Sequence, residues 1–143
     1  RLVQVRQQAV WISSGTVEFA RDRADAGSIV GREKQASVSA TRLKNVLIAE
    51  REVAFLKIDI EGAEFAVLTD IAPELHRVHS AFVEFHINAE NIRAFSTTLE
   101  LLADSGFHVT FGPVHAPTSI PYQIPSERTL FHSQVNAFCV RSH

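Results

Sequence analysis

Acidic and histidine side chains stand near the ends of two apolar stretches of the sequence, where they could act together. One stretch, residues 53–68, reads VAFLKIDIEGAEFAVL, and the other, residues 80–87, reads SAFVEFHI. Carboxylates and an imidazole can exchange protons with a bound molecule in general acid–base catalysis, and they can also hold a divalent cation. The residues that carry these groups are Asp59, Glu61, Glu84 and His86.

The first stretch has the pattern of a strand joined directly to a helix. Residues 53–60 are apolar except for Lys57 and Asp59, which is typical of a strand buried on both faces, and apolar residues recur at helical spacing after Gly62. Asp59 and Glu61 are therefore expected at the carboxyl end of a parallel strand, where ligands bind in open α/β sheets. Helix capping explains acidic residues at a helix start equally well, and Lys57 could simply form an ion pair with neighbours of Asp59.

The second stretch predicts a strand in which the polar side chains share one side. Along residues 80–87, strand alternation sends Phe82, Glu84 and His86 one way and the apolar residues between them the other way. If this strand is the parallel neighbour of the first, both polar sets reach one rim of the sheet. A histidine near a strand end is often structural, but one that faces a second acidic group favours a site.

The run LKIDIEGAE, with VL three residues later, and the run VEFH at residues 83–86 resemble the FkbM-type methyltransferase family. The resemblance extends, more loosely, from about Val10 to the C-terminus. It implies an α/β fold with a doubly wound, mostly parallel sheet of the Rossmann-like class I methyltransferase type and an antiparallel last strand. It also implies an enzyme that uses S-adenosylmethionine to methylate a hydroxyl group of a sugar or related natural product.

Under this resemblance, His86 is the expected general base, because an unperturbed imidazole titrates close to neutral pH. Glu84 or Asp59 is expected to orient His86 or to bind the hydroxyl groups of the acceptor. In a variant of this hypothesis, Asp59, Glu84 and His86 hold a divalent cation such as Mg²⁺ or Mn²⁺, which binds the hydroxyl oxygens.

The resemblance also implies contacts around the site. Lys57, Glu61 and Glu64 are expected to contact the substrate, with the two glutamates lining the rim. Trp11 could border the adenine ring of the cofactor, or it could be an ordinary packing residue.

Length and composition favour one domain, residues 1–143, with a hydrophobic content of 45% that suffices for a core. A formal charge of −2 gives no polyanion-binding surface, so nucleic acid is not an expected partner. The single cysteine excludes an internal disulfide and fits a reducing compartment. No apolar run is long enough to span a membrane and no signal peptide is present, so a cytoplasmic location is expected.

The chain starts at Arg1, contains no methionine, and has six scattered glycines that form no G-x-G loop. We therefore expect the C-terminal, substrate-side part of a methyltransferase domain, without the N-terminal strands and glycine-rich loop of the family. In the family's sheet, the strand at residues 53–60 would then lack a neighbour. Its bare edge could pair with another copy of the chain.

Two other classes of function remain open. The chain could be a non-catalytic partial domain that acts as a binding or structural piece. A metal-dependent hydrolase could use the same acidic and histidine cluster, although the sequence has no H-E-x-x-H motif. Binding of S-adenosylmethionine would separate these classes from a methyltransferase.

Hydrophobic periodicity, together with capping residues, glycines and prolines, predicts the remaining elements. Residues 9–12 and 16–19 are expected to form a β-hairpin, residues 21–37 a loop, and residues 42–49 a helix capped by Thr41. The helix after Gly62 is expected to end before Pro73, and a further helix to span residues 88–105 with Asn88 or Asn91 as N-cap. Strands are expected at residues 107–111 and 135–140, and the proline-rich loop between them offers His115 and Tyr122 as candidate substrate contacts.

Overall fold

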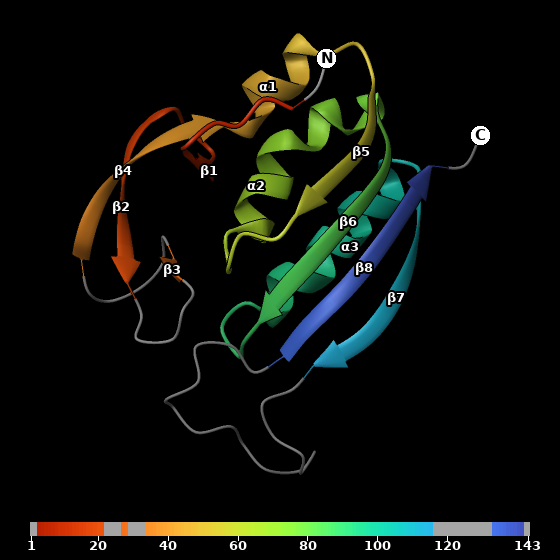
Figure 1. Ribbon diagram of the computed structural model, residues 1–143. Coiled ribbons are helices and arrows are strands. Elements are labelled where there is room, and N and C mark those ends of the chain that lie inside the picture. The colour runs from red at the N-terminus through yellow and green to blue at the C-terminus, as the bar shows by residue number, and fades with distance from the viewer. Residues whose placement is uncertain (1–2, 22–26, 29–33, 116–132, 142–143) are drawn as a thin grey trace.

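Two four-stranded sheets and three α-helices make up the part of the chain that the computed structural model describes, residues 3–21, 27–28, 34–115 and 133–141 (Figure 1). In chain order the elements are β1 (Ala9–Trp11), β2 (Gly15–Arg21), β3 (Gly27–Ser28), β4 (Lys34–Arg42), α1 (Leu43–Ala49), β5 (Val53–Ile58), α2 (Glu64–Ile71), the 3₁₀ helix η1 (Ala72–Arg77), β6 (Val78–Ile87), α3 (Ile92–Asp104), β7 (Phe107–His115) and β8 (Ser133–Arg141). Among the described residues, no helix is long and apolar enough to cross a membrane.

The first sheet has the strand order β1-β4-β2-β3, and this order contradicts the predicted hairpin. β1 and β2 do not pair with each other: β1 pairs parallel with β4, and β2 pairs antiparallel with β4 on its other side. The nine-residue β4 offers a partner on both edges, which local sequence around Gly15 could not reveal. The loop predicted at residues 21–37 is wrong where β3 and the start of β4 lie, and its other residues, apart from Arg21 in β2, are outside the described part.

The second sheet, in the order β5-β6-β8-β7, holds the two stretches that carry the polar residues. β5 and β6 are parallel neighbours, as predicted, and β8 is the predicted antiparallel last strand. The prediction of one mostly parallel sheet is wrong, because β6–β8 and β8–β7 are antiparallel and the described strands form two mixed sheets. The prediction that β5 is buried on both faces is also wrong, because Phe55 is 59% exposed. β5 is the edge strand of this sheet next to β6.

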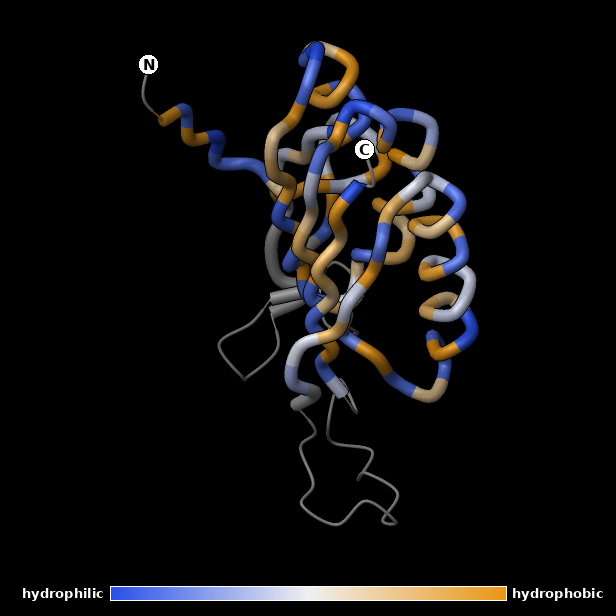
Figure 2. The backbone as a smooth tube through the Cα atoms, turned by 90° about the vertical axis from the view of Figure 1, so that its right-hand side faces the viewer, coloured by the Kyte–Doolittle hydropathy of each residue, from blue (hydrophilic) through white to orange (hydrophobic). Residues whose placement is uncertain are grey.

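Helices pack on one face of this sheet (Figure 2), and alternation along β6 turns every second side chain toward them. Val83 and Phe85 are fully buried, and Phe85 stacks on Phe65 of α2 and meets Phe95 of α3 edge-on. Burying each such side chain contributes about 1.5–3 kcal/mol. The opposite face carries the polar residues of β6 together with Phe82, whose ring contacts that of Phe138 on β8.

Most helices begin and end near the capping residues, prolines and glycines from which their boundaries were predicted. α2 ends at Ile71, and the chain continues as η1 with Pro73 in its first turn, where a missing N–H costs nothing. α3 begins after Asn91, and Gly106, with φ = +85°, follows its end. α1 is capped by Arg42 in an extended conformation, not by Thr41, because β4 continues to that residue.

Candidate functional site

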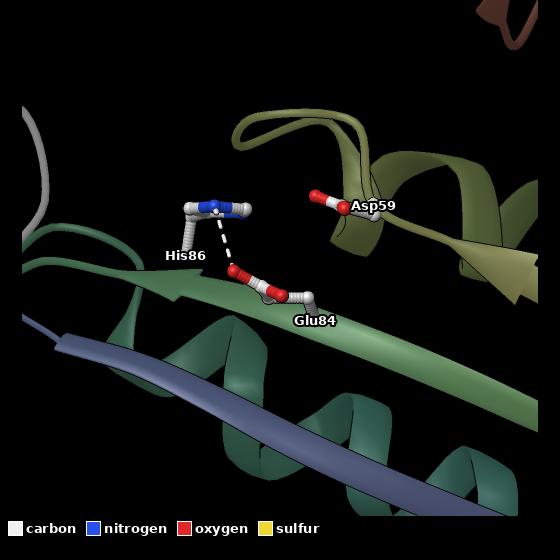
Figure 3. Close-up of side chains that lie close together, drawn as sticks. All are labelled: Asp59, Glu84 and His86. Atoms are coloured by element: carbon white, nitrogen blue, oxygen red, sulfur yellow. Dashed lines mark ion pairs between the residues drawn. The ribbon is translucent and has the colours of Figure 1, made fainter. Parts of the chain in front are cut away.

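The structure brings Asp59, Glu84 and His86 together at the carboxyl ends of two neighbouring strands (Figure 3). Ile58 pairs with Val83, so Asp59, the next residue along, comes beside Glu84 on β6. One ligand atom from each of the three side chains lies within 4.8 Å of the others. This proximity depends on the parallel pairing, which sends both strand ends to the same rim.

His86 is the centre of the site. Its side chain is fully buried, and its two ring nitrogens face different carboxylates. Nδ1 lies 3.0 Å from Oε1 of Glu64. Nε2 lies 3.3 Å from Oε2 of Glu61 and 3.8 Å from Oε1 of Glu84. His86 therefore has an inner nitrogen held by Glu64 and an outer nitrogen that faces the rim.

Glu64 departs from its expected position on the rim. Its side chain is fully buried against Nδ1 of His86, whereas the Glu61 side chain is 32% exposed at Nε2, so Glu64 does not line the rim. Its carboxylate accepts hydrogen bonds from the backbone N–H of Ile60, at 3.2 Å, and of Gly62, at 2.9 and 3.1 Å. Glu64 opens α2, where acidic side chains can reach back to preceding N–H groups, and this familiar first-turn behaviour is the sequence feature that could have located it.

A tight turn makes the contact between Glu64 and His86 possible. Glu61 and Gly62 both have left-handed backbone conformations, with φ = +53° and φ = +95°. Such a conformation is uncommon for a residue other than glycine, and it clusters at functional sites when the surroundings enforce it. The turn points the N–H of Gly62 at Glu64 and directs Glu61 toward Nε2 of His86.

The carboxylates determine the protonation of His86. Burial, the largest single effect, lowers the pKa of the imidazole, because it disfavours the charged form. The hydrogen bond and charge of Glu64, with the charges of Glu61 and Glu84, outweigh burial and raise the pKa of His86 above its ordinary value. The ring therefore holds its proton more tightly than a free imidazole does.

The remaining candidates lie farther out or in other elements. Lys57 is 59% exposed and forms an ion pair with Asp59 itself, with Nζ 3.1 Å from Oδ2, rather than with neighbours of Asp59. Trp11 belongs to β1 in the first sheet and is half-buried. Tyr122 lies outside the described residues.

An open groove of about 590 Å³ runs between the start of the first sheet and α2, away from the acidic cluster. It is lined by Ile12, Arg42, Phe65, Ala66, Thr69 and Asp70. Arg42 spans it with two contacts to the Asp70 carboxylate, from Nε at 2.9 Å and from the terminal nitrogen at 2.5 Å. The charges of Arg42 and Asp70, which both line the groove, are therefore paired with each other.

Comparison with known families gives one match. A sequence model of the methyltransferase FkbM domain matches residues 7–109, well over half of the chain. The matched region includes β5, β6 and all of the residues gathered around His86. The comparisons with curated proteins and with solved structures returned no significant match.

Proposed function

The chain belongs to the FkbM methyltransferase domain family, and from this premise we propose that it transfers a methyl group from S-adenosylmethionine to a hydroxyl group of a sugar or related natural product. The observation that carries the proposal is the meeting of Asp59, Glu84 and His86 at one rim inside the matched region. A histidine and carboxylates at this position suit binding of hydroxyl groups and removal of a hydroxyl proton.

The donor set fits a cationic cofactor. The sulfonium centre of S-adenosylmethionine is positively charged, and three partly exposed carboxylates face the rim. Their side chains are 31% exposed for Asp59, 32% for Glu61 and 25% for Glu84. When bound, the cofactor supplies a methyl group on sulfur that a nucleophile can attack in line.

The chain's own groups would align the acceptor and receive its proton. The hydroxyl oxygen forms the new bond to the methyl carbon as the carbon–sulfur bond breaks, and the hydroxyl proton passes to Nε2 of His86. Because its pKa is raised, neutral His86 is a stronger base than a free imidazole, although less of it is neutral at pH 7. Asp59 and Glu84 would hydrogen-bond the acceptor's other hydroxyl groups, Glu61 and Lys57 would contact the acceptor at the same rim, and Trp11 would border the cofactor.

A variant of the proposal adds a divalent cation. Asp59, Glu84 and Nε2 of His86 are close enough to share one ion, and carboxylates with one imidazole suit Mg²⁺ or Mn²⁺. In this variant, Asp59, Glu84 and His86 would hold the ion, which would supply a Lewis acid for the acceptor oxygen. Methyl transfer would then stop in EDTA and return with added Mn²⁺, whereas an EDTA-insensitive rate would leave the proton transfer to His86 alone.

The test follows transfer of a labelled methyl group from S-adenosylmethionine to a panel of hydroxylated acceptors. The variants are His86→Gln and, as a matched control, His79→Gln. His79 is half-exposed and lies near the start of the same strand, β6. We expect the first to lower turnover by about 100-fold or more while cofactor affinity stays within about threefold, and the second to change neither.

Two results would count against the proposal. Equal turnover in His86→Gln and the wild type would remove His86 from the mechanism. Absence of cofactor binding and of methyl transfer in the wild type would overturn the enzymatic function. That second result would favour a non-catalytic domain that acts through the exposed edge of β5.

A further inference from the structure

We propose that Glu64 is a positioning residue of this site, which holds the His86 ring so that Nδ1 points inward and Nε2 faces the acceptor. The effect of Glu64 on turnover rests on the proposed methyl transfer. The contact itself needs neither cofactor nor acceptor, so it can be tested separately.

Geometry separates Glu64 from the other carboxylates around His86. Glu64 lies at Nδ1, at the hydrogen-bond distance of 3.0 Å, whereas Glu61 and Glu84 lie at Nε2, at 3.3 and 3.8 Å. A carboxylate can only accept, so Nδ1–H must donate to Glu64. When the ring is neutral, this hydrogen bond therefore leaves the lone pair on Nε2, the nitrogen that faces Glu61 and Glu84.

Glu64 is itself held in place, which a positioning group requires. Both of its oxygens accept from backbone N–H groups of the preceding turn, at Ile60 and Gly62. The backbone of His86 is fixed as well, because the Asn91 side chain donates to its carbonyl oxygen at 2.9 Å. The ring and the main chain of His86 are thus anchored from two different elements.

Glu64 contacts Nδ1 of His86, whereas a molecule at the rim would meet Nε2 together with Glu61 and Glu84, so Glu64 has no direct place in the reaction. Its side chain and that of His86 are both 0% exposed, whereas Glu61 and Glu84 keep part of their surface. Any influence of Glu64 on a bound molecule must pass through His86. An orienting carboxylate of this kind, which fixes the tautomer of a catalytic imidazole, is worth up to about 10⁴-fold in turnover in the Ser-His-Asp enzymes.

The alternative is that Glu64 only stabilises the turn at residues 60–62. Glu64→Gln distinguishes the two roles, because the amide keeps the size of the side chain and an oxygen that accepts from Gly62. The amide can also donate an N–H to Nδ1 of His86, which permits the opposite tautomer. Loss of the tautomer with retention of the fold is therefore the result that the positioning role predicts.

The first measurement is the nitrogen NMR spectrum of the histidine rings in ¹⁵N-histidine-labelled chain, in an alkaline buffer where the imidazole is neutral. The spectrum of His86→Gln identifies the His86 resonances among the seven histidines. We expect the wild type to carry the proton on Nδ1 and Glu64→Gln to shift it toward Nε2. Glu100→Gln, an exposed glutamate on α3, should leave the ring resonances unchanged.

Identical His86 ring resonances in Glu64→Gln and the wild type would overturn the proposal. If Glu64→Gln unfolds, Glu64→Asp provides the same test, because the shorter carboxylate can still anchor the turn but withdraws from Nδ1. Ring resonances of a folded Glu64→Asp that match the wild type would overturn the proposal equally.

The second measurement separates this proposal from the proposed function. In the methyl-transfer assay we expect Glu64→Gln to lower kcat by about 100-fold with little change in KM for S-adenosylmethionine. An unchanged kcat in a variant whose tautomer has shifted would overturn the role of Glu64 in turnover. A wild type without methyl transfer would refute the proposed function, while the NMR comparison would still decide the positioning of His86.

Discussion

Removal of the Glu64 carboxylate should cost the fold more than removal of any exposed carboxylate. The side chain is fully buried and accepts hydrogen bonds from two backbone N–H groups and from Nδ1 of His86. Taking away one partner of a buried charged pair typically costs about 3–5 kcal/mol, because the other partner is left without compensation. Total stabilities of single domains are only about 5–15 kcal/mol.

For Glu64→Ala we therefore expect a loss of about 3–5 kcal/mol in the free energy of unfolding. His86 can lower this cost by giving up its proton, and water can reach the N–H of Gly62, which is only partly buried. Both effects place the expected loss toward the lower end of the range. A loss of about 3 kcal/mol lowers the unfolding temperature of a domain of this size by roughly 10 °C.

Urea unfolding followed by circular dichroism measures this loss. Glu100→Ala is the matched control, because Glu100 is exposed on α3 and its truncation should stay within about 0.5 kcal/mol of the wild type. Glu64→Gln should fall between the two, since it keeps the acceptor and removes the charge. If Glu64→Ala were no less stable than Glu100→Ala, the buried contact with His86 would not exist in solution and the positioning argument would fail with it.

Two further variants test the packing of α2. The hydrogen bonds from Arg42 lower the pKa of Asp70 below its ordinary value of 3.8, so this pair stabilises the fold above that pH and the stabilisation disappears as pH falls through the lowered pKa. Asp70→Asn should therefore have a lower unfolding temperature than the wild type at pH 7, and the difference between the two should shrink as the pH falls. A difference in unfolding temperature that does not change with pH would contradict this explanation. Phe85→Ala should lose about 3–5 kcal/mol in urea unfolding, because it empties the space between two other rings, and a loss below about 1 kcal/mol would contradict the packing.

The elements that the sequence predicted well are those whose hydrophobic period is strong and whose partner lies nearby in the chain. β5, α2 and β6 follow one another as strand, helix and strand, and the parallel pairing of β5 with β6 is the expected outcome of that order. α3 shows a clear apolar stripe and ends at Gly106. In these places local preference and tertiary packing agree.

The first sheet shows where sequence reasoning fails. Two short β-prone runs around Gly15 favour a hairpin, yet both strands pair with β4, whose residues lie 31 positions from their partners in β1 and 14 to 25 positions from their partners in β2. The exposure of Phe55 on β5 was missed for a related reason, because an apolar run looks the same whether both faces of the sheet are covered or only one. Strand order is a property of the whole sheet, and the period of a single run does not contain it.

The site itself was predictable in part, for a reason that also explains the error over Glu64. A strand period of two fixes that Glu84 and His86 share a side, and parallel pairing then fixes that Asp59 joins them. The position of Glu64 depends instead on the left-handed turn at Glu61 and Gly62, which folds the start of α2 back toward His86. Regular elements could be predicted residue by residue, whereas an irregular turn decides whether an acidic side chain reaches the rim or the interior.

The division of the carboxylates follows from this turn and has a chemical consequence. One carboxylate, Glu64, is enclosed and fixes His86, while Glu61 and Glu84 remain partly exposed at the outer nitrogen. Had the turn been a regular helical start, Glu64 would have joined the exposed group and His86 would have lacked an inner partner. The left-handed backbone at Glu61 and Gly62 thus allows Glu64 to meet Nδ1 of His86. Under the proposed methyl transfer, this contact would direct Nε2 toward the hydroxyl proton.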